Sequence, residues 1–338
     1  MTSSVPSFAG AVPVVGDSLS PRDRLGAWRV RWSIRRSHYR VDPGLYAVGA
    51  PNDRAPVLVT ANYKLSFDAL RSQLGGRDAW ILVLDTRGVN VWCAAGKGTF
   101  STDELCRQMD GAALPMVVSH GVVVLPQLGA PGVAAPEVKR RTGFRVIYGP
   151  VRASDLPNFL DAGMRATPEM RRVTFTLRDR LVLAPVELAP VLGVALVLLA
   201  AATAIAGFGP DLFSVARALQ AVGPATALLL VTLVAGSVIT PLLLPWVPGR
   251  MFSVKGAVVG TALVAILLPF LLGTLSPVRL AAGAALIVAG SSYAAMNFTG
   301  STTFTSLSGV LHEMRKSLPW QVGGAAAALL LWIVGGFL

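Results

Sequence analysis

Up to about residue 150, short apolar segments alternate with amphipathic ones, and this pattern predicts strands that alternate with helices. The expected strands are residues 56–60, 79–85, 116–118, 122–125 and 144–148, and the expected helices are 66–73, 101–110 and 135–142. Such alternation is typical of an α/β domain with a mostly parallel, doubly wound (Rossmann-like) sheet. Residues 1–54 are rich in Pro, Gly and Arg, and we expect them to form an extended arm that wraps this domain or a partner.

After residue 180 the pattern changes to long continuous apolar stretches. Five of them are each long enough to cross a hydrocarbon core of about 30 Å, and they lie near residues 183–206, 222–244, 254–275, 278–297 and 319–338. Only Ser276 and Pro277 separate the third from the fourth, so these two can instead form one re-entrant pair. The predicted organisation is an arm (1–54), an α/β domain (55–180) and an all-α transmembrane domain of about five helices (181–338).

Ionisable residues divide the chain at the same point. Residues 1–180 hold 24 of the 30 Lys and Arg residues and 15 of the 18 Asp and Glu residues. The remaining residues carry too few charges for a soluble fold of their length.

The basic residues that flank the spans are unevenly distributed between the two sides. One side has nine of them, namely Arg165, Arg171, Arg172, Arg178, Arg180, Arg250, Lys255, Arg315 and Lys316, and the other side has Arg217 and Arg279. This bias predicts a multi-pass protein of the cytoplasmic (inner) membrane, with the N-terminal domain in the cytoplasm and the C-terminus outside.

The net charge of +12 does not by itself indicate nucleic-acid binding, because attraction to anionic lipid and the insertion bias account for it. We therefore expect the bilayer as a partner and no nucleic acid. One cluster of basic residues lies far from the predicted spans, in an Arg-rich run with two tryptophans: Trp28, Arg29, Arg31, Trp32, Arg35 and Arg36. It can pack along the membrane surface or against a partner, or it can be a solvated basic face. The first 20 residues lack the basic start and apolar core of a signal peptide, so none is expected.

One thiol stands out as candidate chemistry. Cys93 lies in the segment 90–97 (Asn-Val-Trp-Cys-Ala-Ala-Gly-Lys), between a predicted buried strand and a predicted helix start. Open α/β sheets bind ligands at the carboxyl ends of their strands, where this segment is expected. The small residues after Cys93 would let a flat cofactor approach the backbone, and Lys97 and a nearby helix amino terminus would favour the thiolate. The alternative is a buried cysteine that packs as a small hydrophobic residue.

The same eight residues resemble the cap-helix signature of the HgcA family, the membrane-bound corrinoid proteins of the mercury-methylating pair, whose soluble domain is similar to corrinoid iron-sulfur proteins. Residues 57–64 (Val-Leu-Val-Thr-Ala-Asn-Tyr-Lys) and 125–133 (Leu-Pro-Gln-Leu-Gly-Ala-Pro-Gly-Val) resemble other corrinoid-contacting loops of that domain. The resemblance implies a cobamide with its own base displaced and Cys93 as the lower axial ligand of its cobalt. It also implies methyl transfer from methyl-Co(III) cobamide to Hg(II), giving methylmercury. Implied partners are an HgcB-like ferredoxin protein with two 4Fe–4S clusters and a folate-linked methyl donor enzyme.

Three loops at strand ends are expected to converge on one edge of the sheet and to form the cofactor cradle: residues 60–64, 90–99 and 127–133. An apolar floor would come from Val91, Trp92, Ala94, Ala95, Leu128 and Val133, and hydrogen bonds from Thr60, Asn62, Asn90, Thr99 and Gln127. The predicted contacts are completed by Lys64, Cys93, Gly96, Lys97, Ala130 and Gly132. For each polar residue taken singly, a turn or cap role is an equal alternative.

Other motifs are weaker. Gly96-Lys97-Gly98-Thr99 is similar to part of a phosphate loop, but Gly88 is too far upstream and Gly98 stands where Ser or Thr should bind magnesium. The corrinoid loop with an Asp-x-His-x-x-Gly pattern is absent, because His120 lacks the Asp, and we expect His120 to have a loop or packing role. The two cysteines and three histidines have no zinc or iron-sulfur spacing, so no such cluster is expected in this chain. Cys106 is expected in a helix core, unpaired with Cys93.

The predicted function is a corrinoid-dependent methyltransferase that methylates Hg(II). The alternative is a membrane-anchored corrinoid methyl carrier or methyltransferase with a different acceptor. A transporter or sensor is disfavoured because the spans contain almost no ionisable residues, and transport paths usually need some.

Overall fold

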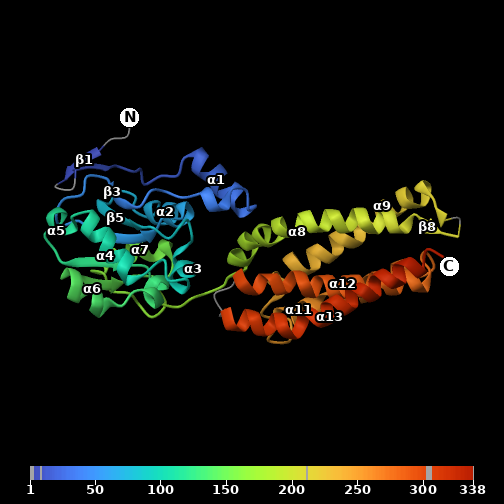
Figure 1. Cartoon of the computed structure of the whole chain (residues 1–338). Helices are drawn as coiled ribbons and strands as arrows, with labels where there is room; N and C mark the ends of the chain where they lie inside the picture. The colour runs from blue at the N-terminus through green and yellow to red at the C-terminus, as the bar shows by residue number, and fades with distance from the viewer. Residues whose placement is uncertain (1–3, 8–9, 211, 302–306, 338) are drawn as a thin grey trace. The chain divides into compact units, whose positions relative to one another are not determined.

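The computed structural model describes residues 4–7, 10–210, 212–301 and 307–337, and the chain divides into two compact units (Figure 1). One unit comprises residues 1–30 and 34–174, and the other comprises residues 31–33 and 175–338. The first contains a β-sheet with flanking helices, and the second is built mainly of long helices.

A five-stranded mixed sheet forms the centre of the first unit. Its strands follow the order β3 (Gly44–Val48), β5 (Ala79–Leu84), β4 (Val57–Ala61), β6 (Val122–Leu125) and β7 (Arg145–Tyr148). The last four in this order are parallel, whereas β3 runs antiparallel to β5 at the edge. Every residue of β4 and β5 is buried, as their continuous apolar runs require. The α/β class is confirmed, and the edge strand β3 comes from the segment that was expected to be an arm.

The strand order reverses at β4. The chain passes from β4 to β5 on one side and then to β6 on the other. In open α/β sheets such a switch point leaves a crevice at the carboxyl ends of the two strands, and ligands bind there. The order of the strands therefore places a potential binding site at the ends of β4 and β6.

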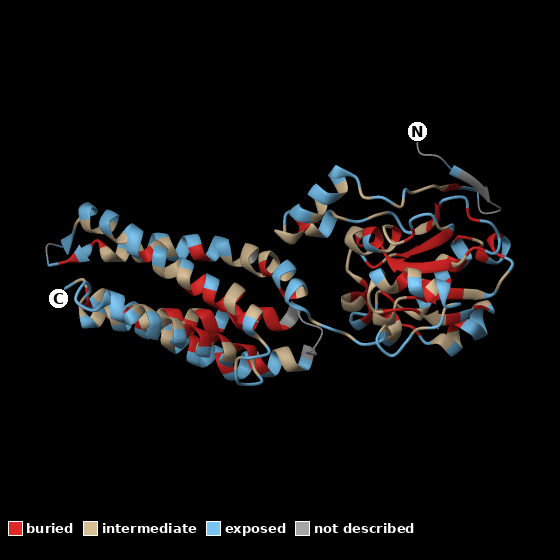
Figure 2. Cartoon of the chain, turned by 180° about the vertical axis from the view of Figure 1, so that it is seen from behind, coloured by how far each residue is buried: buried red, intermediate tan, exposed pale blue. Residues whose placement is uncertain are grey.

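Helices cover both faces of this sheet, and Figure 2 shows the buried residues concentrated between them. The residues of α3 (Val91–Gly96), α4 (Thr102–Gly111), α5 (Leu114–Val117) and α6 (Ala135–Thr142) pack into one apolar cluster. Those of α2 (Lys64–Arg71) and α7 (Leu156–Asp161) pack into the other. The strand expected at 116–118 is wrong, because Leu114–Val117 is a helical turn with Pro115 in its first positions. A four-residue apolar run does not distinguish a buried strand from a buried helical turn.

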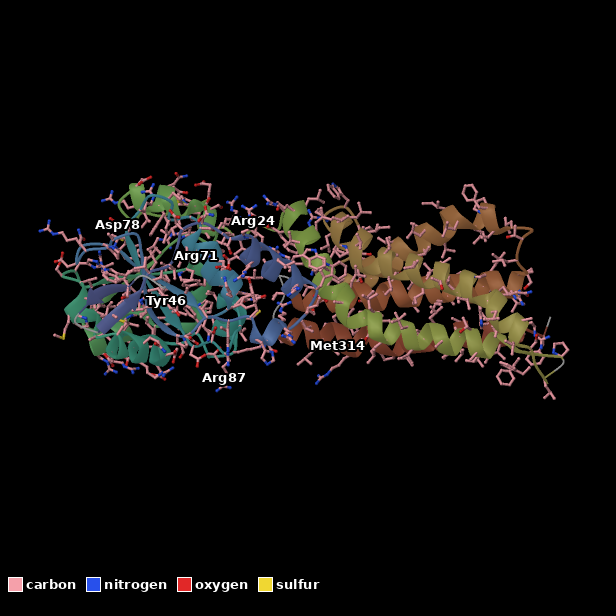
Figure 3. The ribbon with its side chains drawn as sticks, turned by 90° about the horizontal axis from the view of Figure 1, so that it is seen from above. Arg24, Tyr46, Arg71, Asp78, Arg87 and Met314 are labelled. Atoms are coloured by element: carbon pink, nitrogen blue, oxygen red, sulfur yellow. The ribbon has the colours of Figure 1, made fainter. Side chains whose placement is uncertain are left out.

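The N-terminal segment is tied to the domain by a cluster of charges. It begins with the hairpin β1 (Ser4–Ser7) and β2 (Gly10–Pro13) and continues to α1 (Pro21–Arg31). Asp23 of α1 accepts hydrogen bonds from Lys64 at 2.6 Å and Arg71 at 2.9 Å, and both bases also contact Asp68. Arg71 lies inside the unit (Figure 3) and donates to the Gly16 and Ser18 carbonyls. The segment is therefore held to α2 by paired, largely buried charges.

Five long helices make up most of the second unit: α8 (Leu177–Ala206), α9 (Val215–Val234), α11 (Phe252–Leu271), α12 (Pro277–Asn297) and α13 (Leu307–Val334). A hairpin of β8 (Phe208–Gly209) and β9 (Leu212–Phe213) connects α8 to α9, and α9 continues through a π-helical turn at Ala235–Ile239 into α10 (Thr240–Leu243). Among the described residues, four helices are long and apolar enough to cross a membrane. The count rises to five if α8, bent by 49° at position 190, is one span. The third and fourth predicted stretches form two separate helices, each long and apolar enough to cross a membrane.

Small residues let these helices approach closely. Gly256 and Gly260 of α11 face Ser291 of α12, whose hydroxyl lies 3.0 Å from the Gly256 carbonyl oxygen. A Cβ at Gly256 would collide with the Ser291 carbonyl oxygen and the Ala295 methyl group. Helices in lipid associate through such close backbone contact, because burial from water is not available to drive them together.

A buried carboxylate joins the start of α11 to α13. Glu313 is 4% exposed and accepts the Ser253 N–H at 2.6 Å and the Thr299 hydroxyl at 3.2 Å. The Ser253 hydroxyl lies 2.8 Å from that of Ser317, one turn further along α13. Glu313 was not predicted as part of a span, because α13 begins about three turns before the fifth predicted stretch.

The charge cluster at Asp23 predicts an acid-sensitive N-terminal segment. Burial raises the pKa of the Asp23 carboxyl, but hydrogen bonds from Lys64 and Ser20 outweigh this and hold the pKa well below its usual range. The unfolded pKa is about 3.9, so the stabilisation is complete above that pH and is lost as pH falls toward the lower folded pKa. Asp23→Asn should lower the local opening free energy of residues 16–30 by about 2–3 kcal/mol at neutral pH. Hydrogen exchange of α1 tests this, with Asp42→Asn as control. Equal protection of α1 in the two variants would contradict it.

The contact at Gly256 predicts that no side chain larger than hydrogen fits at this position of α11. Gly256→Val should disrupt the packing of α11 on α12 and lower the thermal stability of the detergent-solubilised protein, because the added side chain meets backbone rather than a flexible side chain. Gly323→Val, on α13, is the matched control, since a Cβ there meets nothing within 4 Å. Similar melting temperatures for the two variants would show that the α11–α12 contact does not limit stability.

Candidate functional site

A cavity of about 250 Å³ lies at the carboxyl edge of the sheet, at the switch point between β4 and β6. Thr60 closes it from the end of β4, and Pro126 and Leu128 close it after β6. The start of α3 contributes Asn90, Val91 and Trp92, α2 contributes Ser66, Ala69 and Leu70, and the segment after β7 contributes Gly149–Ala153 and Leu156. The lining is mainly apolar with a few polar groups, which is typical of cofactor sites.

Cys93 is the third residue of the short helix α3, directly after the lining residues Val91 and Trp92, and does not itself line the cavity. The segment was expected to be a loop, and it instead forms a helix whose N-cap is Asn90, with the Asn90 side-chain oxygen accepting the Cys93 N–H at 2.9 Å. Asn is a favoured N-cap residue, so the capping role of Asn90 is one that its residue type makes predictable. Trp92 and Cys93 are half-buried and Gly96 is exposed, so the thiol lies on the outer side of α3.

The small residues of α3 have a different role from the one expected. Ala94 is fully buried and Ala95 is 7% exposed, and both belong to the apolar core. The helix packs against the 3₁₀ segment η2 (Gln127–Gly132), where a Cβ at Gly132 would lie 3.1 Å from the Ala95 Cα. Ala94, Ala95 and Gly132 therefore allow α3 to approach η2 and do not form an open floor for a cofactor.

The amide of Asn62 shapes the segment that leads to α3. Asn62 is 1% exposed, and its side-chain oxygen accepts the N–H groups of Thr86 at 3.1 Å and Gly88 at 2.8 Å. The same oxygen lies 2.8 Å from the Thr86 hydroxyl, and the Asn62 amide group donates to Asp85 at 3.0 Å. Arg87, at the tip of this turn, points away from the ribbon (Figure 3). Asn62 is thus fully engaged in positioning residues 85–88 and acts on the site through them.

Several other predicted contacts have partners elsewhere. Lys64 belongs to the charge cluster with Asp23 and Asp68, and the Gln127 side-chain oxygen accepts from Arg171 at 3.1 Å. Val133 is buried, and its carbonyl accepts the Tyr148 hydroxyl at 2.7 Å. The remaining three lie near α3 without lining the cavity: Lys97 is its exposed C-cap, Thr99 lies 3.4 Å from the Ala94 carbonyl oxygen, and Ala130 lies in η2.

The structure therefore brings five of the predicted residues to the cavity: Thr60, Asn90, Val91, Trp92 and Leu128. The sequence analysis missed the wall formed by Gly149–Ala153, including Arg152, whose guanidinium donates to the Thr174 hydroxyl at 2.7 Å. A signal was available, because this segment directly follows the fourth parallel strand and must emerge at the same edge.

The remaining candidate ligands have packing roles. Cys106 is 1% exposed within α4, where burial raises the pKa of its thiol, and His120 lies 2.9 Å from the Ala55 carbonyl oxygen through its Nε2 atom. Both agree with their predicted roles. Within the described ranges, no group of three or more His, Cys, Asp or Glu side chains could hold a metal ion.

Residues 32–160 match the model of a known family. That family is described as the CO dehydrogenase/acetyl-CoA synthase delta subunit. The chain is also similar to the gamma subunit of the acetyl-CoA decarbonylase/synthase complex, with 33% identity over 128 residues in Methanopyrus kandleri. The Methanothermobacter thermautotrophicus subunit is 32% identical over 128 residues. These alignments cover 37% of this chain and 27% and 28% of the two relatives, so the chain spans about a quarter of their length. Every residue lining the cavity falls inside the range 32–160.

The role of Asn62 can be tested directly. Asn62→Ala removes the acceptor of two backbone N–H groups, and we expect the local opening free energy of residues 85–90 to fall by about 3 kcal/mol. Hydrogen exchange of this segment is the measurement. Asn52→Ala is the matched control, because the Asn52 side chain also accepts a backbone N–H, from Arg54, but is exposed. Unchanged exchange at residues 85–90 in Asn62→Ala would rule out this positioning role.

Proposed function

We propose that this chain is a membrane-anchored corrinoid protein that carries and transfers methyl groups, with its cobamide at the carboxyl edge of the sheet. The observation that carries the proposal is the half-buried Cys93 on α3, directly after Asn90, Val91 and Trp92, which line the cavity at the switch point. The similarity of residues 32–160 to subunits of acetyl-CoA decarbonylase/synthase systems supports the corrinoid class.

The shape of the site sets where such a ring would lie. A cavity of about 250 Å³ is smaller than most ligand pockets, which hold about 300–1,000 Å³. A corrin ring would therefore cover the cavity mouth rather than enter it, with Trp92 and Leu128 as apolar contacts and Asn90 and Thr60 as polar ones. Arg152 would supply a positive charge at the same edge. This set fits the group without using the buried Ala94 and Ala95.

Each residue of α3 then has a defined task. A bound cobamide would supply a cobalt-bound methyl group for transfer. Cys93 would hold the cobalt through its sulfur, and the Asn90 cap would fix the direction of that side chain through the backbone of the helix. Asn62 would hold the turn before α3 in place, so that the sulfur and the sheet edge keep a constant separation.

We further propose Hg(II) as the methyl acceptor. The support is the resemblance of residues 90–97 to the HgcA signature. A cysteine thiolate that holds the cobalt would donate electron density to it and would favour methyl transfer to a soft metal ion. A methyl carrier with another acceptor is the second candidate, and the similarity to acetyl-CoA decarbonylase/synthase subunits favours it. The proposal includes the ferredoxin-like partner with two 4Fe–4S clusters and the folate-linked methyl donor.

The domain limits also belong to the proposal, with cofactor binding in residues 55–180 and anchoring in residues 181–338. The N-terminal unit would face the cytoplasm and the C-terminus the outside, as the distribution of basic residues favours. The four or five apolar helices are consistent with an anchor in the bilayer.

The two cysteines provide a matched test. Cys93→Ala should lose the thiolate-ligated spectrum on titration of the solubilised protein with a cobamide, and it should lose nearly all methyl transfer to Hg(II). Cys106→Ala should keep both, since Cys106 is buried in α4. Ultraviolet-visible spectra report ligation, and methylmercury formation reports activity. If both variants retain the spectrum, Cys93 is not the ligand. If the native protein shows thiolate ligation but methylates only other acceptors, the mercury proposal fails and the methyl carrier stands.

A further inference from the structure

Helix α1 has two chemically different faces. At about 100° per residue, Asp23, Gly26 and Val30 share one face of the helix, and the first two contact residues of the first unit. Val30 is 2% exposed, and a Cβ at Gly26 would lie 2.7 Å from the Tyr39 ring. The Tyr39 hydroxyl donates to the Asp23 carbonyl at 3.2 Å. Together with the ion pairs of Asp23, these contacts fix which side of α1 faces outward.

The outward face combines exposed apolar groups with arginines. Leu25 is 50% exposed and Trp28 is 56% exposed, and at helical spacing they are neighbours at the centre of this face. Arg24 lies on one side of them and Arg22 and Arg29 lie on the other, all exposed. Figure 3 labels Arg24 on α1.

No acidic side chain balances these arginines within α1. Asp23 is the only acidic residue of the helix, and it is turned inward and paired with Lys64 and Arg71. The outward face is therefore positive at its margins and apolar at its centre. The buried charge cluster holds the inward side of the helix to α2.

We propose that the outward face of α1 binds the anionic surface of the bilayer. Trp and Leu are the side chains that enter the boundary between headgroups and acyl chains, and flanking arginines attract lipid phosphates. The second unit carries helices able to cross a membrane, so a lipid surface is present at high effective concentration wherever this chain is inserted. The charge cluster links α1 to α2, three of whose residues line the cavity. This inference does not depend on the identity of the cofactor or of the methyl acceptor.

The test uses the full chain in nanodiscs of phosphatidylglycerol or of phosphatidylcholine, with hydrogen exchange of residues 22–31 as readout. We expect slower exchange in the anionic discs, and loss of this difference at high salt. Arg22→Gln/Arg29→Gln should weaken the lipid-dependent protection about 30-fold, as two surface arginines are removed. Leu25→Ala should weaken it as well.

The control is Arg107→Gln/Arg140→Gln, which removes two exposed arginines from α4 and α6 and should leave the protection of α1 unchanged. Unchanged exchange elsewhere in the first unit would show that the variants remain folded. Equal exchange of α1 in the two lipids would overturn the proposal and would favour a protein as the partner of this face. An equal loss of protection in the control variant would also overturn the proposal, because the lipid-dependent protection would then depend only on the net charge of the protein.

Discussion

The hydrogen bonds of one buried side chain, Asn62, connect the sheet to the proposed site. β4 ends at Ala61, so the backbone of Asn62 is fixed by a strand that is buried along its whole length. Its amide then holds the turn at residues 85–88, which leads to the N-cap Asn90 and to Cys93. A side chain that both donates and accepts is required there, because the turn presents two N–H groups and a carboxylate to the same point. An apolar residue would remove the acceptor of both N–H groups, of which the Thr86 N–H belongs to a fully buried residue.

The parts of the structure that were predictable from sequence are those that a local pattern of residues determines. The central strands β4 and β5 were predicted correctly because a run of apolar residues between turn signals has one stable outcome when both faces are covered. The α5 turn was mistaken for a strand because four residues carry no period. The edge strand β3 was missed, since its antiparallel pairing with β5 arises from contacts more than 30 residues apart in the chain.

Within the site, the sequence indicated which residues lie close together better than it indicated what each of them does. Cys93, Asn90 and Trp92 lie close together as the spacing indicated, because one helical turn contains all three. Lys64 and Ala95 were assigned to the cofactor, yet they satisfy a charge cluster and a helix contact formed by residues 23 and 132. Long-range partners of this kind leave no local pattern. A polar or small residue at a strand end is therefore ambiguous until its partners are known.

The carboxylate of Glu313 has a consequence for how the second unit is made. It caps an N–H group at the start of α11, yet it is synthesised 60 residues after Ser253. Until α13 emerges, this backbone group has to find a temporary partner, and such a need is costly wherever water is scarce. The contact between the start of α11 and α13 therefore forms only after residue 313 has been made. A chain cut short before this residue would lack the acceptor of the Ser253 N–H group.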